Sequence, residues 1–382
     1  MYETPKYTGN LLKDQILLLL TSCGRASRSD VNCMHESDSY IANCISGLKS
    51  ARYITSTTSR PPELLIGQKM MQLLEQEDPA SYEHCLRITN NLHSGGTARH
   101  IDNSKRASRI VALMIAANIF VGPQKPSLPD ILNGTEEKIK VPTRTFFLNK
   151  EIRYTDEQKK SRAYLSRSSG VIFSRGTTGL VYSASDINLR MMKRTELEAT
   201  MRVSRHIQDL YDNPEQFACR DNIIVCDTDE NAARLFVPQA KQESNRVTLG
   251  DAVWNKAITG AAFRYIPANN VGAEYLNYIT SITRQELLMV AFTKEELIAA
   301  EKETTGDAVT KGLICYEYLS CNVTKLAYIK RTHPDLSKIG IVCWDGQQDF
   351  LHRFFDSKNL RLRVIKRDSL ENIRPMRKEK QS

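Results

Sequence analysis

The chain has 382 residues, of which 41% are apolar and 25% are charged, with only 18 glycines and 13 prolines. This composition is ordinary for a globular protein and excludes a collagen-like, low-complexity or wholly disordered chain. The net charge of +9 divides into +3 for residues 1–125, +1 for residues 126–240 and +5 for residues 241–382. The basic excess at both ends favours a polyanionic partner, and the length favours two or three domains.

Nothing in the sequence indicates a membrane or secreted protein. Apolar runs such as Ile16–Leu20 are far shorter than the ~20 residues that a membrane-spanning helix needs. The first residues are polar and do not resemble a signal peptide. The 9 cysteines have no C-x-x-C spacing, which is typical of reduced thiols. We therefore expect a cytoplasmic protein that does not contact a membrane.

The first 78 residues predict three short helices followed by a hairpin. A leucine-rich helix begins at Leu11 and ends near Gly24, and Ser27 or Ser29 is suited to cap a second helix. A third helix begins in the Ser37–Ser39 cluster and carries apolar residues at helical spacing. Segments 51–58 and 63–67, rich in strand formers, flank a Pro-Pro turn, and a further helix follows over 68–76.

This order is typical of a winged helix, in which the third helix enters the DNA major groove and the hairpin contacts the backbone. We expect the third helix to read base edges and the cations to neutralise phosphates. The candidate DNA-binding residues are Arg28, Ser39, Tyr40, Asn43, Lys49, Arg52 and Arg60. The alternative is a winged helix that only contacts proteins, because the third helix exposes no arginine.

Residues 79–130 form a helical connector and linker in this interpretation. Helices are expected over 79–92 and 103–118, and the second carries Lys105, Arg106 and Arg109 on a face that we expect to be solvent-exposed. Loop residues at 122–134 separate this connector from the rest of the chain.

Residues 131–382 alternate strand and helix signals, which predicts an α/β domain with a mixed sheet and a basic C-terminal tail. Strands are expected at 141–148, 170–173, 180–183, 222–226, 263–266, 313–319, 339–344 and 360–365, with helices at 156–165 and 195–211 and after most of the later strands. The predicted fold class is thus α/β for this domain and α+β for the chain overall, in which a winged helix-turn-helix precedes the α/β domain with its mixed sheet.

Two of these strands end in carboxylates, at Asp227 and at Asp345. Asp227-Thr228-Asp229 is similar to the D-x-D segment with which toprim domains hold divalent metal for phosphoryl transfer. A toprim site also needs a glutamate on an earlier strand, and none precedes Asn222 at a strand end. We therefore interpret Asp227 and Asp229 as caps of the helix that follows.

Other catalytic signatures are missing from the sequence. It has no phosphate-binding loop, no G-x-G-x-x-G, no G-x-S-x-G and no H-E-x-x-H. A nuclease core needs an acidic residue before a D/E-x-K motif, and the hairpin at 170–186 offers only Asp186. We expect no catalytic residues, no metal site and no cofactor, while a toprim-like or nuclease-like enzyme using Asp227 and Asp229 stays open as the alternative.

The organisation of the chain resembles the replication-relaxation family of winged-helix proteins encoded by bacterial plasmids and integrative elements. The segments that carry the resemblance are Gly47–Ile54, Ile66–Lys69, Val181–Tyr182 and Asn222–Leu235. The resemblance implies an accessory role in replication, transfer or regulation of a mobile genetic element. Double-stranded DNA is the expected partner, and a homodimer or contacts with replication or transfer proteins stay open.

Overall fold

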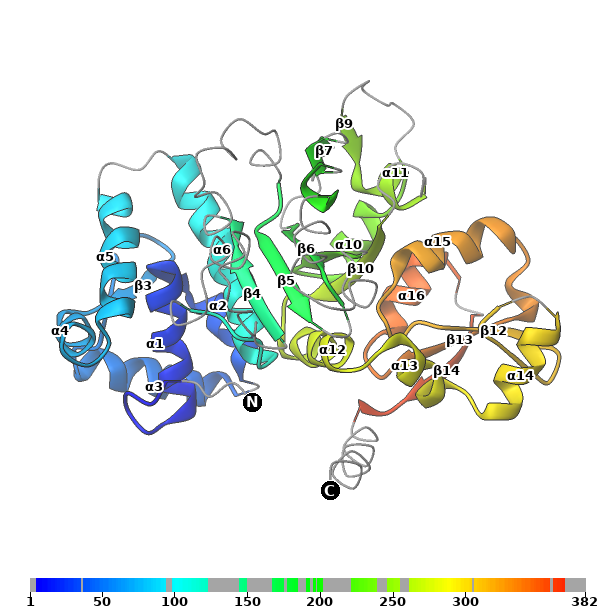
Figure 1. The fold of residues 1–382 in the computed structure, drawn as a ribbon, viewed down its shortest axis with the longest axis horizontal. Helices are drawn as coiled ribbons and strands as arrows, with labels where there is room; N and C mark the ends of the chain where they lie inside the picture. Colours follow the sequence, from blue (N-terminus) through cyan, green and yellow to red (C-terminus); the bar gives the residue numbers. More distant parts are fainter. Residues whose placement is uncertain are drawn as a thin grey trace, which may run out of the picture.

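The computed structural model describes residues 5–35, 37–93, 98–122, 144–149, 167–174, 177–184, 190–192, 195–196, 198–201, 221–238, 246–254, 261–303, 306–357 and 360–367. It combines a helical N-terminal unit with two larger sheets, each flanked by helices (Figure 1). The predicted α/β class with a mixed sheet is confirmed. The predicted helix at 156–165, most of the one at 195–211, the loop at 123–134 and the basic tail beyond 367 lie outside the described residues.

The N-terminal unit contains the three predicted helices and the predicted hairpin, in the predicted order. Gly24 ends the first helix with a φ of 76°, and the side chains of Ser27 and Ser37 cap the second and third. A three-residue strand that the sequence analysis missed pairs with the hairpin and completes an antiparallel sheet of order β1-β3-β2. The elements are α1 (Leu11–Cys23), β1 (Arg25–Ser27), α2 (Arg28–Val31), η1 (Asn32–Met34), α3 (Asp38–Ser50), β2 (Ile54–Ser56), β3 (Glu63–Ile66), α4 (Gln68–Glu77) and α5 (Pro79–His93).

The helix α6 (Ala98–Ala116) lies between the N-terminal helices and the five-stranded sheet (Figure 1). Its residues Ile110–Ile115 are buried, and the helix contacts α1, α2 and β1 as well as β6 (Gly179–Ser183) and α12 (Asn270–Ser281). The expectation of a solvent-exposed basic face is wrong for Arg109, whose side chain is only 26% exposed. The guanidinium group of Arg109 forms an ion pair with Asp227, and its Nε lies 3.8 Å from a carboxylate oxygen of Asp30. Arg109 therefore joins the N-terminal unit to the sheet.

The larger sheet has the order β10-β8-β6-β5-β4 and is parallel over its first three strands. Alternate side chains of β8, which lies between β10 and β6, face two different cores. Ile223 and Val225 pack into the core that includes α1, α6 and α12, whereas Ile224 and Cys226 pack into the core that includes α10, α11 and α16. The strands are β4 (Arg144–Leu148), β5 (Gly170–Ser174), β6 (Gly179–Ser183), β8 (Asp221–Cys226) and β10 (Ala262–Pro267), and β7 (Arg190–Met192) pairs separately with β9 (Arg246–Thr248). The helices around them are α10 (Asp229–Leu235), α11 (Leu249–Trp254) and α12 (Asn270–Ser281).

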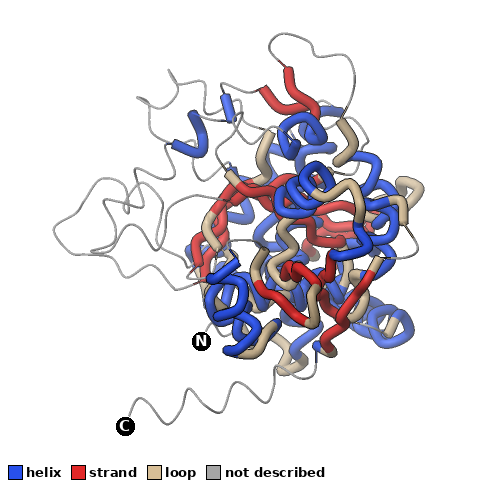
Figure 2. Tube along the Cα trace, turned by 90° about the vertical axis from the view of Figure 1, so that its right-hand side faces the viewer, coloured by secondary structure: helices blue, strands red, loops and turns tan. Residues whose placement is uncertain are grey.

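The second sheet has the order β11-β12-β13-β14, with β12, β13 and β14 parallel to one another. Its edge strand β14 exposes Arg361, Arg363 and Val364, and Arg363 forms an ion pair with Glu296. Figure 2 shows most of the strands, in red, in the middle of the molecule with helices, in blue, around them. The elements are α13 (Arg284–Ala291), α14 (Lys294–Glu303), β11 (Ala308–Thr310), β12 (Leu313–Glu317), α15 (Val323–Thr332), η6 (Leu336–Lys338), β13 (Ile339–Trp344), α16 (Gln348–Phe355) and β14 (Arg361–Ile365).

The two sheets meet along β10. The backbone N–H of Tyr265 donates to the carbonyl of Cys321 at 3.0 Å. Next to it, the buried guanidinium of Arg264 donates to the carbonyl of Ser320 at 2.6 Å and lies 2.8 Å from a carboxylate oxygen of Asp221. A charge buried between two sheets requires such partners, because an unpaired charge there would be costly.

We predict that Asp30→Ala destabilises the protein by about 2 to 4 kcal/mol, because several donors lose a buried acceptor. The Asp30 carboxylate accepts from the Ser27 N–H at 2.8 Å and from the Ser108 hydroxyl at 2.7 Å. Chemical denaturation monitored by circular dichroism measures the change. Glu295→Ala, on the exposed first turn of α14, is the control and should stay within about 0.5 kcal/mol of wild type. Equal stability of the two variants would contradict the role given to Asp30.

Candidate nucleic-acid interface

The helix α3 has one buried and one exposed face, as its sequence predicts. Its buried residues are Ile41, Cys44, Ile45 and Leu48. Ser39, Tyr40 and Asn43, all predicted to contact DNA, are exposed on the other side, and Tyr40 retains 39% of its accessible surface. The structure thus leaves these three polar side chains accessible to a ligand.

Tyr40 is held in place by contacts to other segments. Its hydroxyl accepts a hydrogen bond from the Asn10 side chain at 2.9 Å, and its ring centroid lies 4.8 Å from that of His35. Ser39 lies 3.0 Å, oxygen to oxygen, from Ser37, the N-cap of α3. Sequence reasoning missed Asn10, although an asparagine directly before a leucine-rich helix is an N-cap signal, and Asn10 does cap α1.

The four predicted phosphate-contacting cations are all exposed: Arg28 on α2, Lys49 near the end of α3, Arg52 in the turn after it and Arg60 in the hairpin turn. None of the four forms an ion pair with another residue in the described part of the chain. Arg52 has a positive φ of 61°, and the following N–H, of Tyr53, bonds the carbonyl of Leu48 at 3.0 Å. This turn ties the hairpin to the end of α3.

Three other cations of the N-terminal half have acidic partners. Arg25 and Lys105 both bind the carboxylate of Glu63, at 2.9 and 3.0 Å. Arg109 binds Asp227 and approaches Asp30. These seven basic side chains therefore divide into three that are paired around α6 and four, on and next to α2, α3 and the hairpin, that have no ion pair among the described residues.

The interpretation of Asp227 and Asp229 as helix caps is wrong. The N-cap of α10 is Thr228, whose hydroxyl accepts from the N–H of Asn231 at 3.1 Å. Asp227 is the ion-pair partner of Arg109, and Asp229 accepts from the Tyr265 hydroxyl at 2.7 Å. Both carboxylates thus have protein partners of their own.

The pKa of Asp229 is raised above its ordinary value, chiefly because burial disfavours the charged carboxylate. The hydrogen bond from Tyr265 lowers this pKa, the carboxylate of Asp349 raises it further, and Arg353 lowers it. Asp229 is therefore a partly buried acid, and its ionisation lowers the free energy of unfolding.

Asp345, the other carboxylate at a strand end, belongs to the four-stranded sheet, so it is not part of the same edge as Asp227. Its side chain accepts from the Arg367 guanidinium at 3.0 Å, and Arg367 also binds Glu274 at 2.7 Å. The hairpin strands β5 and β6 carry neither acidic residues nor lysine, and Asp186 lies outside the described residues. In the part of the chain that the structure describes, no three His, Cys, Asp or Glu side chains gather as a metal site would require.

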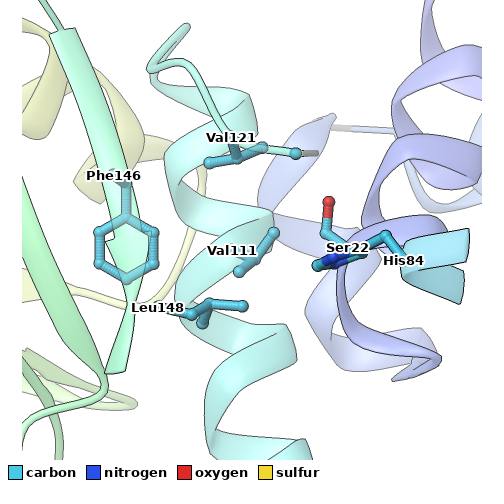
Figure 3. Close-up of a pocket in the computed structure, with 7 residues that line it drawn as sticks. Ser22, His84, Val111, Val121, Phe146 and Leu148 are labelled. Carbon is cyan, nitrogen blue, oxygen red and sulfur yellow. The ribbon is translucent and has the colours of Figure 1, made fainter. Parts of the chain in front are cut away.

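A small gap lies where α1, α5, α6 and β4 meet, next to Gly122 (Figure 3). Its lining is mostly apolar, with Ser22 and His84 as its polar members. Ser22 is 3% exposed and its hydroxyl has no hydrogen-bond partner. The gap has no room for a water molecule, so it is a packing gap and not a ligand site.

Across the described segments, no helix has the length and apolar character needed to cross a membrane. Comparisons with models of protein families, with characterised proteins and with solved structures find no match for this chain.

We predict that Asp229→Asn raises the melting temperature at pH 7. Since the folded-state pKa of Asp229 is raised, the folded protein binds its proton more tightly than the unfolded chain, and stability falls as pH rises from about 4 through that pKa. An asparagine avoids this cost and can still accept from Tyr265, so its advantage should vanish in acid. Thermal unfolding across pH tests this, with the exposed Glu230→Gln as control. A melting temperature of Asp229→Asn below wild type at pH 7 would contradict the prediction.

Proposed function

We propose that the chain is a DNA-binding protein whose N-terminal unit is a winged helix, with α3 as its recognition helix. The order α1, β1, α2, α3, β2, β3 and the small antiparallel sheet support this assignment. The resemblance to the replication-relaxation family supports a role as an accessory protein in replication, transfer or regulation of a mobile genetic element. Such a protein acts on double-stranded DNA in the cytoplasm.

The observation that carries the proposal is the division of the cations. Glu63 pairs with Arg25 and Lys105, and Asp30 and Asp227 lie beside Arg109, whereas Arg28, Lys49, Arg52 and Arg60 stay exposed and unpaired among the described residues. These four lie on the elements that a winged helix presents to DNA. Exposed cations release the counterions of phosphates on binding, which is the main source of affinity for duplex DNA.

The polar face of α3 would then provide sequence preference. Asn43 and Tyr40 carry groups that hydrogen-bond base edges, and an asparagine pairs well with adenine in the major groove. Ser39, in the first turn of α3 beside the N-cap, would bind the backbone through its hydroxyl. The α/β part would serve as the scaffold that α6 holds against this unit, and as the surface for a second copy or for replication or transfer proteins.

We predict that the full chain binds short duplex DNA with a strong dependence on salt. Four phosphate-neutralising cations correspond to a slope of log affinity against log salt of roughly −3 to −4. Fluorescence anisotropy with a labelled duplex between about 50 and 200 mM salt measures this slope. If the protein binds no duplex at the lowest salt, the DNA-binding proposal fails and the protein-contact alternative for the winged helix is favoured.

We predict different effects for a base-contacting and a phosphate-contacting residue. Asn43→Ala should weaken binding to a duplex selected from a random library by about 5- to 100-fold and leave binding to random duplex unchanged. Arg60→Ala should weaken both equally and reduce the salt slope by about 0.9. Identical behaviour of the two variants on both duplexes would contradict the assignment of α3 as the recognition helix.

The purified full chain also tests the enzyme alternative. If Asp227 and Asp229 held Mg²⁺ for strand cleavage, the protein would nick supercoiled plasmid with Mg²⁺ and Asp227→Asn would lose that activity. The partners of the two carboxylates favour a structural role, since Arg109 already neutralises Asp227. We expect no nicking by the wild type. If the wild type nicks plasmid with Mg²⁺ and Asp227→Asn does not, the enzyme alternative replaces the binding-protein proposal.

A further inference from the structure

The first turns of α1 and α3 lie against each other. Asn10 caps α1 by accepting from the N–H of Lys13 at 3.1 Å, and its amide donates to the hydroxyl of Tyr40 at 2.9 Å. One side chain therefore sets the start of α1 relative to the proposed recognition helix. Lys13 is the third residue of α1 and is the cation that this helix carries.

The end of the Lys13 side chain lies next to Gly47 of α3. A Cβ atom at Gly47 would lie 3.3 Å from the Nζ of Lys13 and 3.5 Å from its Cε. Gly47 is thus where the ammonium group of Lys13 rests on α3, and any side chain there would occupy the space that the lysine uses. Gly47 is one helical turn from Asn43 and from Ser50, and both are exposed.

Lys13 is half-buried and has no ion pair within the described residues. The neighbouring Asp14 does not neutralise it, because that carboxylate accepts from the N–H groups of Tyr7 and Thr8 and from the Thr8 hydroxyl. An ammonium group with no carboxylate beside it among the described residues is available to bind an anion such as a phosphate. The only cation that α3 itself supplies is Lys49, near its C-terminal end.

We infer that Lys13 is a further DNA-contacting residue: its ammonium group, beside Gly47, binds a phosphate of the duplex whose base edges face Asn43. This inference rests on the proposed function and adds a third helix, α1, to the interface that α2 and α3 would form. It provides positive charge beside Gly47, one helical turn from Asn43, whereas the only cation of α3 itself is Lys49. In a helix-turn-helix the helix before the recognition helix crosses the DNA backbone, and here that helix is α2, so Lys13 would add a phosphate contact from outside the motif.

The test uses the full chain with Lys13→Gln, Lys13→Arg and a matched control, Lys294→Gln, which removes the same charge from an exposed position on α14. Lys13→Gln should weaken binding to selected and random duplex alike by roughly fivefold and reduce the salt slope by about 0.9. Lys13→Arg should keep the wild-type slope, and Lys294→Gln should behave as wild type.

Gly47→Ala provides a second test that does not change charge. The added methyl group would lie 3.3 Å from the Nζ of Lys13, so the flexible end of that side chain has to shift slightly, while alanine favours the helix by about 0.5 to 1 kcal/mol relative to glycine. We expect weaker DNA binding with an equal or higher melting temperature, a combination that unfolding would not produce. If the wild type binds duplex and Lys13→Gln keeps both its affinity and its slope, the inference is wrong and the proposed function stands. If the wild type binds no duplex, both fail.

Discussion

The packing of the molecule depends on how α6 buries its charge. This helix lies between the N-terminal unit and the larger sheet, and one residue on it, Arg109, cannot be removed from water without anions beside it. Asp30 comes from the N-terminal side and Asp227 from the end of β8. Because both carboxylates must reach the same guanidinium, they restrict how far the unit can rotate or slide against the sheet. Lys105 and Glu63 add a further charged contact on the same helix.

The same arrangement determines which surface stays available. Acidic residues lie where α6 meets its neighbours, and they neutralise Arg25, Lys105 and Arg109 there. Arg28, Lys49 and Arg60 are exposed without such partners among the described residues. The N-terminal unit therefore keeps unpaired positive charge on α2, α3 and the hairpin, even though the net charge of residues 1–125 is only +3. Unpaired surface cations of this kind attract a polyanion.

Local signals made much of the N-terminal unit predictable. Helix caps such as Ser27 and Ser37 act within three residues, so the sequence contains all the information that they need. The partners of Arg109 were not predictable, because Asp227 is 118 positions away and only the fold brings it close. Three adjacent residues at 227–229 are all able to cap a helix, and only the backbone geometry selects Thr228. β1 has just three residues and no periodicity to detect.

The ion pairs around α6 also affect how such a protein can evolve. Arg109 and Lys105 are encoded in the segment after the N-terminal unit, while two of their partners, Asp30 and Glu63, are encoded inside it. Recombination that exchanged only the first 78 residues would leave these cations facing side chains that did not co-evolve with them. An exchange that carried α6 along with the unit would keep these two pairs and would have to match only Arg109 to Asp227 on the sheet side. The segment to exchange would then extend to Ala116, beyond the part that would contact DNA.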